Sequence, residues 1–79
     1  PSFSNNDINV YPNPTSGEFT IFAPEHSSIK IINCLGRIVH QVKAPSHKII
    51  VDLSNKSKGL YLIIVIKNNK SITRRILVY

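Results

Sequence analysis

The stretch Gly59-Leu60-Tyr61-Leu62-Ile63-Ile64-Val65-Ile66 decides the fold class. After its glycine it is apolar without interruption and rich in branched side chains. A polar loop precedes it, and Lys67-Asn68-Asn69-Lys70 follows as a hairpin turn. An apolar run of this length between turns predicts a β-strand that is covered on both faces.

On either side of this run, apolar and polar residues alternate in short segments, which is typical of half-buried strands. No stretch has a convincing 3.6-residue period, and no internal repeat occurs. About seven short strands, spaced every ~8–12 residues, predict an all-β fold, an antiparallel immunoglobulin-like β-sandwich. The expected strands are 8–11, 18–22, 28–33, 37–42, 47–53, 60–66 and 71–79. The expected inward side chains are Phe19, Ile21, Ile29, Ile31, Ile49, Val51, Leu53, Ile72, Ile76 and Val78.

Turn residues separate these strands. Pro12-Asn13-Pro14 ends the first one, because two prolines fix φ and remove two backbone donors. We expect the Asn13 side chain to hydrogen-bond the backbone of its own turn. Gly17, Gly36 and Gly59 lie where turns meet strands, and Gly36 is expected to take the positive φ of a tight hairpin after Asn33.

The loop between the fifth and sixth expected strands has two further signals. Tyr61, at the start of its strand, predicts a tyrosine corner, in which the phenol bonds backbone a few residues upstream. Asp52 is expected to brace the loop that follows it. For each of these turn residues, specification of the fold is the simplest role.

The chain has 79 residues, enough for one domain, with an expected stability of about 4–12 kcal/mol. Cys34 is the single cysteine, so no intrachain disulfide can form. No signal peptide or membrane-length apolar run is present, and the chain begins at Pro1. We therefore expect a fragment of a longer protein, with the end of a linker at 1–7 and one domain at 8–79.

The charge balance is basic, with ten Lys and Arg against four acids. No acid occurs after Asp52, and such a field favours acidic partners. A solvated surface is the slightly favoured interpretation, because the charges are spaced through strands and not massed in one run. The cations of this part are Lys56, Lys58, Lys67, Lys70, Arg74 and Arg75. Nucleic acid is not an expected partner, because the aromatic residues are not interleaved with the cations.

Catalytic and metal chemistry are not expected. Cys34 with His26, His40 and His47 lacks the spacing of a zinc site, and a domain of 8.9 kDa has little room for a catalytic cleft. The four acids are scattered, without the spacing of a paired acid and base. The sequence thus predicts no enzyme, no cofactor and no metal.

Four blocks in order nevertheless resemble one family closely. They are Val10-Tyr11-Pro12-Asn13-Pro14 with Gly17-Glu18-Phe19-Thr20-Ile21; Ile31-Ile32-Asn33-Cys34-Leu35-Gly36-Arg37-Ile38-Val39; Asp52-Leu53-Ser54 with Gly59-Leu60-Tyr61; and Thr73-Arg74-Arg75-Ile76. The chain resembles the type A C-terminal sorting domain of the Bacteroidetes type IX (Por) secretion system. That family often has Asp at the position of Asn33 and Lys at that of Arg75.

The resemblance implies a folded secretion signal that follows a cargo domain. The cargo would pass through the periplasm, and the outer-membrane translocon would recognise the signal. A sortase-like peptidase would then cut before the domain, and the cargo would be anchored at the cell surface or released outside. No membrane insertion is implied. The candidate recognition residues are Pro12, Asn13, Pro14, Gly17, Asn33, Gly36, Asp52, Gly59, Tyr61, Lys70, Arg74 and Arg75.

Two hypotheses concern how the signal is recognised. In the first, Lys67, Lys70, Arg74 and Arg75 dock on an acidic translocon surface. In the second, 71–79 is an edge strand that pairs with a partner by β-augmentation; a weak homodimer through edge strands is an open alternative. The alternative function is an immunoglobulin-like or carbohydrate-binding accessory module of a secreted enzyme.

Overall fold

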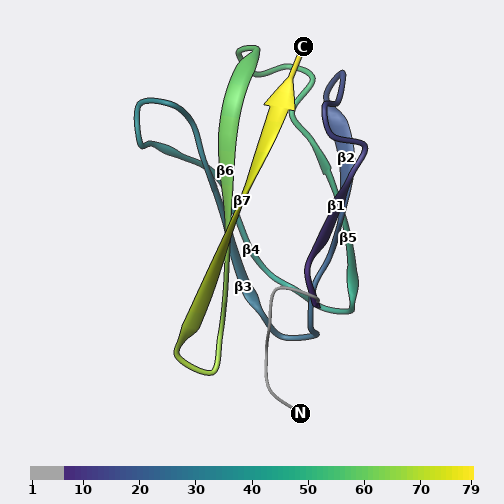
Figure 1. Cartoon of the computed structure of the whole chain (residues 1–79), viewed down its shortest axis with the longest axis vertical. Coiled ribbons are helices and arrows are strands. Elements are labelled where there is room, and N and C mark those ends of the chain that lie inside the picture. The colour runs from purple at the N-terminus through teal and green to yellow at the C-terminus, as the bar shows by residue number, and fades with distance from the viewer. Residues whose placement is uncertain (1–6) are drawn as a thin grey trace.

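The computed structural model describes residues 7–79, and the part of the predicted linker at 1–6 lies outside the described residues. This part of the chain forms an all-β domain of seven strands (Figure 1). The strands are β1 (Asn9–Tyr11), β2 (Glu18–Phe22), β3 (Ser28–Ile32), β4 (Ile38–Lys43), β5 (Lys48–Asp52), β6 (Gly59–Lys67) and β7 (Lys70–Val78). Each predicted strand is confirmed within one residue at either end.

The strands form two sheets that face one another (Figure 1). Sheet A has the order β1-β2-β5 and sheet B the order β4-β3-β6-β7, with antiparallel pairing between all neighbouring strands. The predicted antiparallel sandwich is confirmed. The fourth strand pairs with the third in sheet B, whereas a constant-type immunoglobulin domain would place it beside the fifth strand.

One core lies between the sheets. Phe19 and Ile21 of β2 enter it from sheet A, and Ile29 and Ile63 enter it from sheet B. The predicted inward side chains are all buried, except that Ile49 and Ile72 are partly buried and pack against the core. Alternation of apolar residues along each strand was therefore a correct guide to the inward face, because successive side chains of a strand point to opposite faces.

The prediction that the 60–66 run is covered on both faces was wrong. Tyr61, Ile63 and Val65 of β6 are buried against sheet A. The alternate residues point to the outer face of sheet B, where Leu62 is half-buried and Leu60 is 46% exposed. No element among residues 7–79 forms a third layer over this face. Neighbouring side chains of the same sheet provide what cover there is.

Short turns connect the strands and fix the two ends of the sandwich. Asn68 and Asn69 take positive φ values of 54° and 63° in the β6–β7 turn, as a two-residue hairpin requires. This turn lies at the opposite end of the sandwich from the chain's C-terminus (Figure 1). Within residues 7–79 there is no helix with the length and hydropathy needed to cross a membrane.

Candidate functional site

The segment 12–15 lies along the outer edge of β7 and joins the two sheets. The Asn13 side chain donates from Nδ2 to the Arg75 carbonyl at 2.8 Å and accepts from the Leu77 N–H at Oδ1 at 3.2 Å. Thr15 continues the pairing as a parallel bridge, donating its N–H to the Leu77 carbonyl and accepting from the Tyr79 N–H, both at 2.9 Å. The amide of Asn13 thus takes the place of a strand residue beside β7.

The expectation that Asn13 bonds its own turn was therefore wrong. Its partners lie 62 and 64 residues away in sequence. The physical reason is that β7 is the edge of sheet B, so its outward backbone groups need partners. Asn13 lies beside that edge, where its amide bonds Arg75 and Leu77.

Thr15 and Gly17 hold the same segment against the residues that directly follow β5. The Thr15 side chain is buried, donates to the Glu18 carbonyl at 2.6 Å and accepts from the Gly17 N–H at 3.1 Å. Gly17 has a φ of +150°, and a Cβ there would lie 2.6 Å from the Cβ of Ser54. Gly17 is therefore required by close approach of two backbones, and its carbonyl accepts from the Leu53 N–H at 2.9 Å.

The remainder of the β7 edge is not occupied by segment 12–15. Arg75, Leu77 and Tyr79 present backbone groups to that segment, so alternation places the outward groups of Ser71 and Thr73 on the same side. Within residues 7–79, no other segment hydrogen-bonds the backbone of these two residues on that side; the Thr73 carbonyl accepts from Arg74 Nη1 at 3.5 Å. The open edge of β7 is defined here as 71–73.

The cations predicted to act together do not share one face. Lys67 and Lys70 pair across the β6–β7 hairpin, and the Lys67 ammonium donates to the Glu25 carbonyl at 2.5 Å. Arg74 is half-buried and pairs with the inward-facing Ile63, so it lies on the inner side of β7. Arg75 is exposed on the outer side. The four cations of β6 and β7 therefore do not form a single patch on one face of sheet B.

Asn33 and Gly36 build the β3–β4 turn. The Asn33 side-chain oxygen accepts from the backbone N–H of Leu35 and of Arg37, each at 3.0 Å. Gly36 takes a φ of +83°, which confirms the positive φ expected for it. Because both bonds to the Asn33 side chain end on one acceptor oxygen, an aspartate, the residue common in the family resembled, could make them equally well.

Asp52 and Tyr61 support the loop between β5 and β6. Asp52 Oδ1 accepts from the Ser54 N–H at 2.9 Å, as expected for a residue that braces the loop. The side-chain hydroxyl and the backbone N–H of Ser54 lower the pKa of Asp52, because both bonds favour the ionised carboxylate. The phenol of Tyr61 donates to the Ser57 carbonyl, and the predicted tyrosine corner is confirmed.

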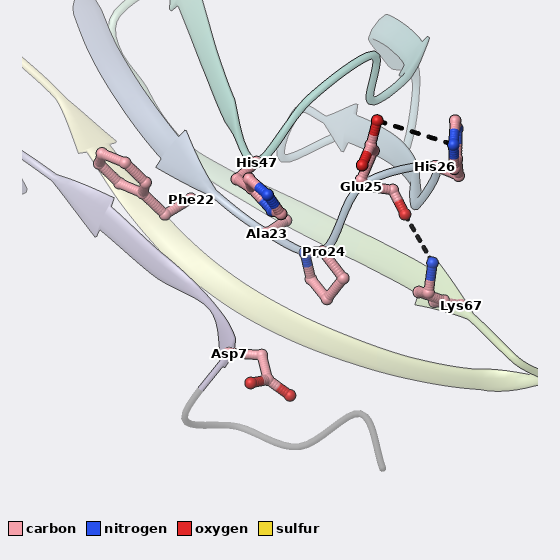
Figure 2. Close-up of a pocket in the computed structure, with 8 residues that line it drawn as sticks. All are labelled: Asp7, Phe22, Ala23, Pro24, Glu25, His26, His47 and Lys67. Atoms are coloured by element: carbon pink, nitrogen blue, oxygen red, sulfur yellow. Dashed lines mark hydrogen bonds and ion pairs between the residues drawn. The ribbon is translucent and has the colours of Figure 1, made fainter. Parts of the chain in front are cut away.

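A hollow of about 440 Å³ lies beside the segment that leads from β2 to β3 (Figure 2). At its rim Glu25 Oε2 lies 3.8 Å from His26 Nε2, and the Lys67 ammonium donates to the backbone carbonyl of Glu25 (Figure 2). Its lining residues are Asp7, Phe22, Ala23, Pro24, Glu25, His26, His47 and Lys67. The hollow contains no nucleophile with an orienting base, and no three His, Cys, Asp or Glu residues among residues 7–79 are grouped to bind a metal. Cys34 lies exposed in the β3–β4 turn.

Taken together, these contacts define a small all-β domain whose N-terminal Pro-Asn-Pro block is bonded to its last strand. Residues 9–79 match the family described as the secretion system C-terminal sorting domain (Por secretion tail). The chain belongs to this family, and it is therefore a C-terminal sorting domain of the type IX secretion system. As such it is a non-catalytic signal that interacts with the type IX machinery, and its cargo is secreted or displayed at the cell surface of Bacteroidetes.

Two known proteins contain a region similar to this chain. The chain is 35% identical over 68 residues to an ulvan lyase, NLR42, of Nonlabens ulvanivorans, a match that covers 82% of this chain and 13% of that protein. The solved structure of PorZ, described as an essential bacterial surface component of the type IX secretion system of Porphyromonas gingivalis, aligns with a TM-score of 0.79. That alignment has 23% identity and covers 94% of this chain and 12% of the PorZ chain, so it establishes the fold. The chain spans about an eighth of either protein.

Proposed function

We propose that this domain directs a cargo polypeptide, located N-terminal to it, through the type IX translocon by offering the open edge of β7 for β-augmentation. In this mode a strand of the partner adds to the sheet and bonds the outward backbone groups of Ser71 and Thr73. The cations Lys70 and Arg75 next to this edge would pair with carboxylates of the partner and oppose unwanted pairing between copies.

The proposal extends to the fate of the domain. The cargo crosses the periplasm, and the outer-membrane translocon takes up the folded signal. A sortase-like cysteine peptidase then cuts upstream of the domain, and the cargo is released or joined to anionic lipopolysaccharide. In this scheme 1–7 is the end of the linker and 8–79 is the signal, with the cut before or within the polar segment that precedes Ile8.

One observation supports the position of the recognition edge. Segment 12–15 covers the C-terminal half of the β7 edge, and its contacts reach Arg75, Leu77 and Tyr79. The backbone of 71–73 lacks such cover within residues 7–79. An uncovered edge strand makes a protein prone to aggregation. We therefore expect such an edge to be kept where a partner strand pairs with it.

Replacement of Thr73 by proline tests the edge with little change to the fold. The Thr73 N–H faces outward, and proline is tolerated in an edge strand where its missing N–H faced solvent. A fluorescent reporter with a signal peptide and this domain is produced in a bacterium with a type IX translocon. We expect Thr73→Pro to reduce export at least tenfold, and Thr73→Val, which keeps the N–H, to be exported normally.

Normal export of the proline variant would refute augmentation at 71–73. Thermal unfolding of the purified fusions identifies a variant that is lost through misfolding. The proposed cut is tested with the wild-type fusion by determining the new C-terminus of the exported reporter. An exported reporter that retains the whole domain would refute removal by a peptidase.

A further inference from the structure

The cations in strands are concentrated in sheet B, an asymmetry that the net charge of the chain does not reveal. The strands of sheet B contain six cations and no acid, whereas those of sheet A contain Lys48 with Glu18 and Asp52. The six cations are Lys30, Lys43, Lys67, Lys70, Arg74 and Arg75. Among residues 7–79 every acid thus lies outside sheet B. A negatively charged surface would be attracted to sheet B and not to sheet A.

The outer face of sheet B carries a continuous apolar surface, here called the apolar stripe. The four alternate residues of β6 form its centre. Register places Leu77 beside Leu60, and Ile32 and Ile38 in one row with Leu62. The stripe consists of Ile32, Ile38, Leu60, Leu62, Ile64, Ile66 and Leu77. Its most exposed members, Ile38, Leu60 and Leu77, have 52%, 46% and 44% of their surface open to solvent.

Three of the six cations point to the same face as the stripe. Lys30 lies beside Ile64, Arg75 lies beside Leu62, and Lys43 lies at the β4 edge. Arg74 lies on the inner side of β7. The face therefore combines an apolar centre with cations on both flanks, which is the composition of an interaction surface with a polar rim.

We infer that the outer face of sheet B is a docking surface for a protein surface of the type IX machinery that has an apolar centre flanked by carboxylates. The inference rests on the proposed function and adds the face and the chemistry of the partner. The charges set this chemistry, because Lys30, Lys43 and Arg75 have no acid on their own sheet and carboxylates of a partner would pair with them.

Continuity with the open edge strengthens the assignment. Ser71 and Thr73, whose backbone forms that edge, carry their side chains on the outer face, in register with Ile66 and Ile64. A partner strand paired at the edge would therefore extend sheet B beside the stripe. The body of that partner could then cover the stripe directly.

Two other occupants fit less well. A second copy of the domain would bring equal arrays of cations together, and like charges in contact are unfavourable. An anionic lipid surface favours protruding aromatic anchors, whereas the four stripe residues of β6 are aliphatic, and Leu62, Ile64 and Ile66 among them are half-buried. The observations therefore favour a protein partner.

The test compares exposed residues on the two outer faces. Leu60→Gln with Leu77→Gln removes the most accessible cross-strand pair of the stripe, and Arg75→Glu reverses a flanking charge. The matched controls on sheet A are Ile50→Gln, at a side chain 59% exposed, and Lys48→Glu. Each variant is placed in the exported reporter fusion, and its thermal unfolding is measured on the purified fusion.

We expect the stripe variants and Arg75→Glu to lower export at least tenfold while both controls are exported normally. Normal export of the stripe variants from a fusion whose wild type is exported would overturn the docking face and leave the sorting function intact. Failure of the wild-type fusion to be exported would refute the proposed function itself.

Two further outcomes would also overturn the inference. One is binding of the wild-type fusion to vesicles of phosphatidylcholine with phosphatidylglycerol that the stripe variants lose. The other is a dimer in sedimentation that the same variants abolish.

Discussion

Sheet A has strands of three to five residues, whereas sheet B contains β6 and β7, each nine residues long. Both sheets contribute inward side chains to the same core. Their outer faces differ. Sheet A presents charges of both signs and the stacked rings of Tyr11 and Phe22, whose centroids are 5.5 Å apart. The outer face of sheet B presents an apolar stripe, and the charged residues beside it are all cations.

The contrast between the outer faces of the two sheets distinguishes the residues that fold the domain from the residues that a partner can bind. Both sheets contribute completely buried apolar side chains, so the core does not distinguish one sheet from the other. The outer face of sheet B has more apolar surface and more charge of one sign than the fold requires. Segment 12–15 connects the two sheets, because it leaves β1 of sheet A and bonds β7 of sheet B.

The largest expected effect comes from substitutions that break the shared core. Phe19→Ala in sheet A and Ile63→Ala in sheet B should each destabilise the domain by about 3–4 kcal/mol, because both side chains are completely buried. Leu62→Ala, on the outer face of β6, should cost less than half as much. Urea unfolding measures all three. If Phe19→Ala leaves the hydrogen-exchange rates of the β6 amides unchanged, the two sheets unfold separately and the single core is refuted.

A smaller effect is expected where β2 meets the loop that crosses from sheet A to sheet B. Gly17→Ala should destabilise the domain by about 2–3 kcal/mol, because it combines an unfavourable φ with a clash. The new Cβ would lie 2.6 Å from that of Ser54. Gly59→Ala is the matched control, since its φ of +136° is also unfavourable but its Cβ would meet no atom within 4 Å. Equal destabilisation of the two variants in urea would show that the close approach has no effect.

The bonds between segment 12–15 and sheet B come next. Asn13→Ala removes a donor from the Arg75 carbonyl and an acceptor from the Leu77 N–H, at a cost of about 1–2 kcal/mol. Hydrogen exchange should accelerate at Leu77 more than at Ile63, because the edge opens before the core. Asn13→Asp keeps the acceptor only and should fall between the wild type and the alanine variant. Unchanged exchange at Leu77 in Asn13→Ala would contradict this role.

The smallest effect is expected at Asp52, at the end of sheet A. Its pKa is lowered in the folded state by bonds from the Ser54 hydroxyl and backbone N–H. The carboxylate therefore stabilises the fold above its unfolded pKa, and this contribution is lost as the pH falls through the lower, folded pKa. Asp52→Asn should lower the melting temperature slightly at pH 7, with the difference fading as the pH falls below the ordinary pKa of an aspartate. A difference that grows as the pH falls would contradict this sign.

Strand positions and inward faces could be predicted from the sequence because both depend on local patterns. The alternation in β2, with Phe19 and Ile21 inward, and the positive φ of Gly36 need no knowledge of distant residues. The opposite orientation of Arg74 and Arg75 follows from the same two-residue period, so the sequence contained the signal against grouping them. The apolar run in β6 was misleading, because it does not distinguish a face covered by a further layer from one left to a partner.

The strands, their turns and the side of each strand that enters the core can be read from the amino-acid sequence, since these follow from steric preferences and burial within a few residues. The arrangement of the strands in space, by contrast, sets three features: Asn13 bonds β7, the backbone of 71–73 has no strand partner on its outward side among residues 7–79, and the cations divide between two faces of sheet B. These features depend on strand order and register between segments as many as 64 residues apart. Backbone hydrogen-bonding groups are the same in every residue other than proline, so the sequence does not specify directly which distant edge they meet.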